Sequence, residues 1–133
     1  MEFEKIKQDI LGKKYSLSVA FVGEKKSREI NKKYRNIDKP TNVLSFALRK
    51  NEGEIILCKS LIRKELKKFG RTFPQLLGYL VIHGMLHLKG MRHSSRMEEA
   101  EQRYDQKYFY RGRHGVYYHK SRSRRISKGR KKS

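Results

Sequence analysis

The segment between Thr72 and Gly90 constrains the fold more than any other part of the chain. Thr72 is followed three residues later by Gln75, which forms a capping box at a helix start. Pro74 stands in the first turn, where its missing N–H costs nothing. The residues that follow are mostly apolar, and Gly90 is a stop signal. We therefore predict a central helix that runs to about Leu88.

Three of the five histidines lie close together in and just after this helix. His83 and His87 are four residues apart, so both imidazoles project from one helix face. The turn at Gly90 allows His93 to return toward them. Three imidazoles are a zinc ligand set that leaves a fourth position open for water, as in catalytic sites. We predict one Zn²⁺ per chain here, although other divalent transition metals accept the same ligands. The competing interpretation is a histidine pair that is only packed and hydrogen-bonded.

Strand patterns precede the helix. Apolar runs over residues 17–22, 42–48 and 54–58 predict strands, with a turn at 51–53 between the last two. The run over 17–22 has apolar residues on both faces, which predicts a central strand. The fold class that we expect is α+β. It is a single small domain with a mixed sheet of about four strands packed with helices, and the metal site lies at the end of the central helix.

Helical spacing recurs in three other places. Ser27 is expected to cap a short helix, and a second helix is expected to end at Gly70. A last helix is expected to open at Ser95 with Glu98 three residues later as a capping box. The apolar residues that we expect on the inner faces of these helices are Ile30, Tyr34, Ile62, Leu66, Phe69, Met97, Ala100 and Tyr104.

The charge of the chain is unusual. Lys and Arg outnumber Asp and Glu by 34 to 13, for a formal net charge of +21. Such an excess repels itself, so it is tolerated mainly where an anionic partner is bound. Nucleic acid is the partner that we expect, and an anionic membrane surface is the alternative. The start of the chain lacks the apolar core of a signal peptide, no apolar run is long enough to span a bilayer, and Cys58 is the only cysteine. We expect a cytoplasmic protein.

The basic and acidic residues are distributed unevenly along the chain, and the change in composition predicts a domain boundary near Tyr110. Residues 111–133 hold ten of the basic residues and no acidic residue. We expect a folded hydrolase domain over residues 1–110 and a basic tail over 111–133 that is disordered when free. The tail arginines expected to contact nucleic acid are Arg111, Arg113, Arg122, Arg124 and Arg125.

The histidine spacing also occurs in the metzincin metalloproteases, within H-E-x-x-H-x-x-G-x-x-H. In those enzymes the Glu beside the first histidine is the general base. That position is Gly84 here, which argues against a peptidase.

Several segments together resemble the YbeY family of bacterial endoribonucleases and rRNA maturation factors. Residues 83–93, HGMLHLKGMRH, resemble the family signature H-G-x-L-H-L-x-G-x-D-H. Residues 31–35 and 39–46, NKKYR and KPTNVLSF, resemble N-x-x-Y-R and P-T-D-V-L-S-F. Residues 53–55, GEI, resemble the G-D-I start of a strand. These matches fall within residues 17 to 109, and the basic tail lies outside them.

The resemblance implies an α+β domain with a metal on the three matching histidines. It also implies cleavage of single-stranded RNA, in maturation of the 16S rRNA 3′ end and in ribosome quality control on the small subunit. Arg35 matches the family arginine that faces the cleft. Asn42 and Arg92 depart from the pattern, because each stands where the family has Asp. A carboxylate near a ligating histidine orients it. Arg92 is instead expected to weaken metal binding or to bind a phosphate.

The residues favour a metal-dependent hydrolase acting on RNA phosphodiester bonds. The metal would activate a water, and Arg35 would stabilise developing negative charge. A surface ion pair between Arg35 and Asp38 or another carboxylate is the structural alternative. The acidic cluster Glu98, Glu99 and Glu101 is expected to be a solvated helix face. The second hypothesis for the whole protein is a non-catalytic RNA- or ribosome-binding factor with a structural or vestigial metal site.

Overall fold

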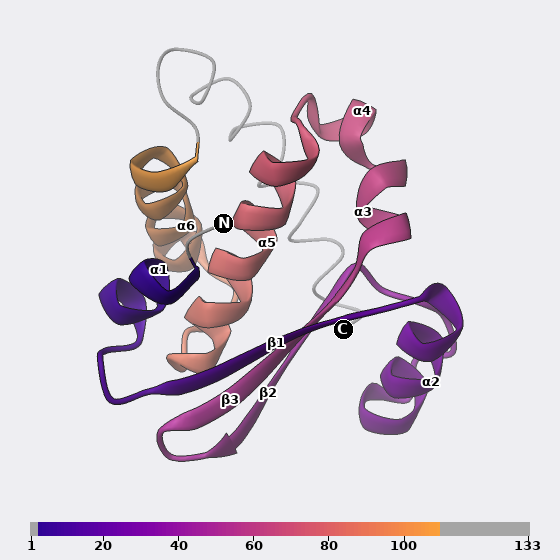
Figure 1. The fold of residues 1–133 in the computed structure, drawn as a ribbon, viewed down its shortest axis with the longest axis horizontal. Helices are drawn as coiled ribbons and strands as arrows, with labels where there is room; N and C mark the ends of the chain where they lie inside the picture. The colour runs from indigo at the N-terminus through magenta and orange to yellow at the C-terminus, as the bar shows by residue number, and fades with distance from the viewer. Residues whose placement is uncertain (1–2, 110–133) are drawn as a thin grey trace.

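A three-stranded sheet and the helix α5 (Phe73–Leu88) form the centre of the computed structural model, which describes residues 3–109. The chain runs through the elements in the order α1–β1–α2–β2–β3–α3–α4–α5–α6 (Figure 1). The bounds of the remaining elements are α1 Phe3–Ile10, β1 Ser16–Val22, α2 Glu24–Arg35, β2 Val43–Arg49, β3 Glu52–Cys58, α3 Lys59–Lys64, α4 Leu66–Phe69 and α6 Ser95–Tyr108. The α+β class and the mixed sheet are confirmed.

The sheet has the order β1-β3-β2, so the prediction of about four strands was too high by one for the described residues. β1 pairs with β3 in parallel, and β2 pairs with β3 antiparallel. The prediction that residues 17–22 form a central strand was also wrong. The central strand is β3, whose Ile55 and Leu57 are fully buried, whereas Phe21 on β1 is 44% exposed. In Figure 1, α2 lies across the sheet from α5. No residue of β1 is fully buried, so its apolar sequence reflects partial burial at the sheet edge.

The helix α5 is confirmed almost as the sequence predicts. The Thr72 hydroxyl accepts a hydrogen bond from the Gln75 N–H, and the Gln75 side chain accepts one from the Thr72 N–H. Every residue from Leu76 to Leu86 is buried, so the core surrounds this helix on all sides. Gly90 has a φ of 104°, a left-handed conformation that favours glycine. It ends the helix and turns the chain back.

The helix α2 differs from the prediction. It begins after Gly23, and Ser27 lies inside it rather than at its cap. The buried Ser27 hydroxyl donates to the Thr41 carbonyl at 2.7 Å and accepts from the Thr41 N–H at 2.9 Å. The inner face is therefore polar and holds a loop, while Tyr34 is 60% exposed instead of facing inward.

Smaller differences occur in three other helices. The segment over residues 59–69 is divided into α3 and α4 at Glu65, although Ile62 and Phe69 are buried as expected. The cap of α6 is Ser94, one residue earlier than predicted, and its hydroxyl accepts from the Met97 N–H. The helix α1 was not predicted from the sequence.

A buried ion pair fixes α6 against the start of α5. The side chains of Arg71 and Asp105 are both fully buried. Arg71 Nη1 donates to Asp105 Oδ1 at 2.8 Å, and Nη2 contacts the second carboxylate oxygen. Such two-point pairing fixes the orientation of both partners. It holds the inner face of α6 opposite the middle of α5.

The close approach of α5 to β3 generates a prediction about Gly84. A Cβ atom at this position would lie 2.9 Å from Ile55 Cδ1 and 3.2 Å from its Cγ1. Overpacking costs about 1–3 kcal/mol, and the helix propensity of Ala returns about 1 kcal/mol. We therefore expect Gly84→Ala to lower the free energy of unfolding by about 1 kcal/mol in urea titrations without added metal.

The control is the same substitution in an Ile55→Val background, which lacks Cδ1, the atom that lies nearest to the added Cβ. There we expect Gly84→Ala to be neutral or stabilising. An equal loss in both backgrounds would show that Ile55 does not limit the space at Gly84.

Candidate metal centre

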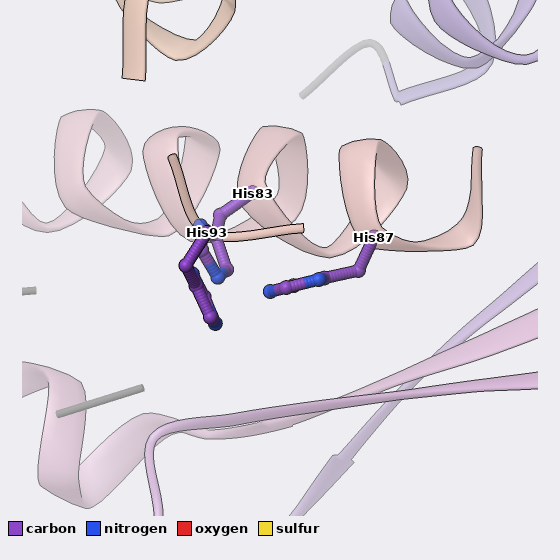
Figure 2. Close-up of side chains that lie close together, drawn as sticks. All are labelled: His83, His87 and His93. Atoms are coloured by element: carbon purple, nitrogen blue, oxygen red, sulfur yellow. The ribbon is translucent and has the colours of Figure 1, made fainter. Parts of the chain in front are cut away.

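The three predicted histidines converge at one point. His83 and His87 project from the C-terminal half of α5, and His93 reaches them from the loop that follows Gly90 (Figure 2). One ring nitrogen from each histidine lies within 4.8 Å of the others. The ring centroids of His83 and His87 are 4.5 Å apart, and those of His87 and His93 are 4.4 Å apart. This group could hold a metal ion.

A carboxylate holds the first of these rings. Glu101 on α6 is only 3% exposed, and its Oε2 contacts His83 Nδ1. Its other oxygen accepts a hydrogen bond from the Tyr79 hydroxyl at 2.5 Å. Because Nδ1 of His83 is engaged, Nε2 is the nitrogen left to bind a metal. Outer contacts of this kind orient ligating histidines and raise their affinity for metal.

The expectation that Glu101 belongs to a solvated helix face was therefore wrong. Glu101 follows Met97 by four residues, so the two share the inner face of α6. That spacing was the available signal, and the neighbouring acidic residues concealed it. Glu99 is exposed and Glu98 half-buried.

A backbone carbonyl holds the second ring. His87 Nδ1 lies 3.2 Å from the carbonyl oxygen of Met91, which the left-handed turn at Gly90 places over the end of α5. Nε2 of His87 is thus also available to a metal. Two of the three histidines are oriented without any carboxylate at position 92. The donor chemistry fits a transition metal such as zinc with one position open.

Arg35 lies in the same pocket as the histidines. The pocket has a volume of about 260 Å³ and is lined by Arg35, Val43, Ser45, His83, Gly84, His87 and His93. Arg35 is the last residue of α2 and is half-buried. Burial lowers the pKa of its guanidinium below the ordinary value, but an arginine still keeps its charge at neutral pH.

The alternative role of Arg35, an ion pair with Asp38, is contradicted. Asp38 Oδ1 instead accepts a hydrogen bond from Arg28 Nε at 2.7 Å, and Lys32 approaches its other oxygen at 4.0 Å. Within residues 3–109, no carboxylate forms an ion pair with Arg35. Its charge faces a pocket that contains the histidines, an arrangement suited to an anion.

Neither Asn42 nor Arg92, the two residues that depart from the family pattern, lines this pocket. The Asn42 amide donates to Glu65 Oε1 at 2.8 Å, a contact in which a carboxylate at position 42 would instead repel Glu65. Arg92 is exposed and lines a separate groove on the other side of the loop that carries His93. The predicted tail contacts, Arg111 to Arg125, lie outside the described residues.

The chain resembles known proteins over most of its length. The sequence model of the family described as "Endoribonuclease YbeY" matches residues 1–111. A Staphylococcus carnosus protein named "Endoribonuclease YbeY" is 38% identical over 110 residues, which are 74% of this chain and 69% of the relative. A Staphylococcus aureus protein of the same name is 36% identical over 115 residues, or 76% and 74% of the two chains.

A solved structure agrees with these relatives. The solution structure of a Thermotoga maritima protein superposes with a TM-score of 0.58 at 33% sequence identity and covers 79% of this chain and 78% of its own. Among the described residues, no helix is long and apolar enough to cross a membrane. From the family match, the identity to its members and the histidine geometry together, we conclude that this chain belongs to the YbeY endoribonuclease family.

Proposed function

We propose that the protein is a metal-dependent, single-strand-specific endoribonuclease of the cytoplasm. It acts in maturation of the 16S rRNA 3′ end and in ribosome quality control, with the small ribosomal subunit as its partner. One Zn²⁺ per chain is held by His83, His87 and His93. The observation that carries this proposal is the position of Arg35, a cation without an ion-pair partner among the described residues, in the same pocket as three convergent imidazoles.

Arg35 has the chemistry to bind the scissile phosphodiester. Its guanidinium presents several N–H donors to phosphate oxygens, and its half-buried position strengthens that attraction relative to bulk water. As negative charge grows on the phosphoryl oxygens, the same donors stabilise the transition state. A divalent metal bound on the histidines supplies Lewis-acid polarisation of the phosphate and a more acidic water.

Glu101 acts through His83 rather than on the substrate. It lies behind the ring and does not line the pocket. By holding the proton on Nδ1, it fixes the tautomer that presents the Nε2 lone pair to the metal. No Asp or Glu lines the pocket among the described residues, so we assign no carboxylate as general base.

The basic tail is proposed to add nonspecific affinity for RNA. Residues 111–133 carry ten Lys and Arg and no acidic residue, and counterion release makes such segments bind nucleic acid strongly at low salt. Its arginines Arg111, Arg113, Arg122, Arg124 and Arg125 would contact phosphates rather than bases. Residues 1–110 form the catalytic domain in this proposal.

The competing function is a non-catalytic RNA- or ribosome-binding factor with a structural or vestigial metal site. It predicts tight, salt-sensitive RNA binding without turnover. This alternative is motivated by the excess positive charge and by the two departures Asn42 and Arg92. Both of these residues lie outside the histidine pocket, which favours the enzyme. A peptidase is disfavoured, because position 84, where metzincins carry the general base, is a glycine.

The first prediction concerns the metal. Replacing His87 with Ala removes one of three ligands, so we expect the metal content to fall from about one per chain to near zero by mass spectrometry. Cleavage of single-stranded RNA should fall at least about 100-fold, since even losing an outer contact to a ligand costs 10–100-fold. The matched control is His114→Ala, which should keep its metal. Full-rate cleavage by metal-free His87→Ala protein would exclude the proposed mechanism.

The second prediction separates Arg35 from metal binding. We expect Arg35→Gln to lower kcat about 100-fold or more, as for loss of an oxyanion donor, while the metal content stays unchanged. Arg28→Gln, on the same helix but paired with Asp38 at the surface, should leave kcat close to native. Equal losses in the two variants would remove Arg35 from the catalytic role.

The third prediction concerns the tail. We expect deletion of residues 111–133 to weaken binding of single-stranded RNA and to flatten the dependence of log Kd on log salt concentration. The metal content should not change. Unchanged affinity and slope would contradict a role of the tail in RNA binding.

A further inference from the structure

A second pocket, separate from the histidine pocket, is lined by the neighbours of His93 in the same loop. This groove has a volume of about 810 Å³ and is lined by the end of α5, the loop that follows it and residues of α6. Its lining residues are Leu86, Lys89, Gly90, Met91, Arg92, Ser94, Ser95, Arg96, Ala100, Arg103 and Tyr104. We call it the α6 groove.

The α6 groove is strongly basic. Lys89, Arg92, Arg96 and Arg103 are all exposed and line it, and no acidic side chain does. None of the four is in an ion pair with another residue of the part of the chain that the structure describes. Some other surface cations do have such partners, as in the pairs of Arg28 with Asp38 and Lys64 with Glu24. Four like charges around one hollow repel one another, and an anionic ligand relieves that repulsion.

The spacing of these charges suits an extended chain of phosphates. Arg96 and Arg103 are seven residues apart, so they lie on one face of α6 about 10 Å apart along its axis. Tyr104 lines the same groove and is half-buried. A cationic groove with an aromatic ring combines backbone attraction with a surface on which a base can stack, as in proteins that bind single strands.

The loop over residues 91–94 joins the α6 groove to the metal centre. His93 lines the histidine pocket, whereas its neighbours Arg92 and Ser94 line the groove. Successive side chains of this loop thus line two different cavities, the histidine pocket and the α6 groove. A nucleic-acid strand that leaves the pocket across this loop would reach the groove within the next nucleotides.

We propose that the α6 groove binds the phosphates of single-stranded RNA next to the nucleotides held in the histidine pocket, with Arg96 and Arg103 as its principal contacts. The inference rests on the proposed function, and it extends the substrate-binding surface beyond the pocket. An anionic lipid surface would satisfy the charges too. A lipid surface would not use the Tyr104 ring or the junction between the groove and the histidine pocket. These two features therefore favour RNA as the ligand of the groove.

The test compares two double variants of equal net charge in the full-length protein loaded with zinc. Arg96→Gln with Arg103→Gln removes two groove cations. Lys25→Gln with Lys26→Gln removes two exposed cations from α2, across the sheet from α5 in Figure 1. Fluorescence anisotropy measures binding of a 4-nucleotide and a 12-nucleotide single-stranded RNA over a series of salt concentrations, and gels verify that the RNA stays intact. Thermal unfolding verifies that both variants are folded.

We expect the arginine variant to bind the 12-nucleotide RNA about tenfold more weakly than native protein, since two exposed charge contacts are lost. The slope of log Kd against log salt concentration should fall by about 1.4, or about 0.7 for each lost phosphate contact. Binding of the 4-nucleotide RNA, which fills only the pocket, should match native protein. The lysine variant should match native protein with both RNAs.

Three outcomes would overturn the proposal. Equal weakening in both double variants would show that affinity follows net charge alone. Unchanged 12-nucleotide binding in the arginine variant would exclude the groove. Loss of binding to anionic phospholipid vesicles, with RNA binding intact, would assign the groove to a membrane. Because all these measurements report binding, they remain decisive even if native protein with zinc fails to cleave RNA, a result that would refute only the proposed enzyme activity.

Discussion

The buried carboxylate of Glu101 is the contact on which the arrangement of the three histidines depends. A carboxylate removed from water is costly unless its oxygens are engaged, and here one contacts His83 while the other accepts from Tyr79. Both partners belong to α5, so the interaction fixes α6 against α5 at the level of the histidine cluster. Asp105, one turn further along α6, is engaged by Arg71 in the same way. Two acidic side chains thus set both the packing of this helix pair and the orientation of a ligand.

The parts of this arrangement that follow from local sequence were predictable. The capping box at Thr72, the four-residue spacing of His83 and His87 and the stop at Gly90 each act within one or two turns of chain, and the structure has all three. The four-residue spacing from Met97 indicates that Glu101 lies on the inner face of α6, but local sequence does not identify Tyr79 and His83, the partners from another helix that offset the cost of its burial. The central position of β3 likewise depends on which strands pair, and an apolar run alone does not state that.

The two departures from the family pattern also show how much depends on distant partners. In the sequence alone, an arginine at position 92 within the histidine motif suggests a damaged metal site. In the folded chain it faces away into the α6 groove, and the His87 ring is held by the Met91 carbonyl. Asn42 similarly looks like a lost carboxylate, yet its amide is the group that can donate to Glu65. Whether a substitution harms a site is decided by what surrounds it in space.

The segment between Gly90 and Ser94 has a consequence for how metal and substrate affect each other. It contributes His93 to the histidine pocket and Arg92 to the α6 groove. A metal ion coordinated by His93 would therefore anchor the wall of the α6 groove, and a strand bound in the groove would restrain the third ligand. By thermodynamic linkage the two effects would be equal in free energy, so RNA that tightened this segment would strengthen zinc binding by the factor by which zinc would strengthen RNA binding. Zinc affinity in the cell would then depend on whether the protein is engaged with its substrate.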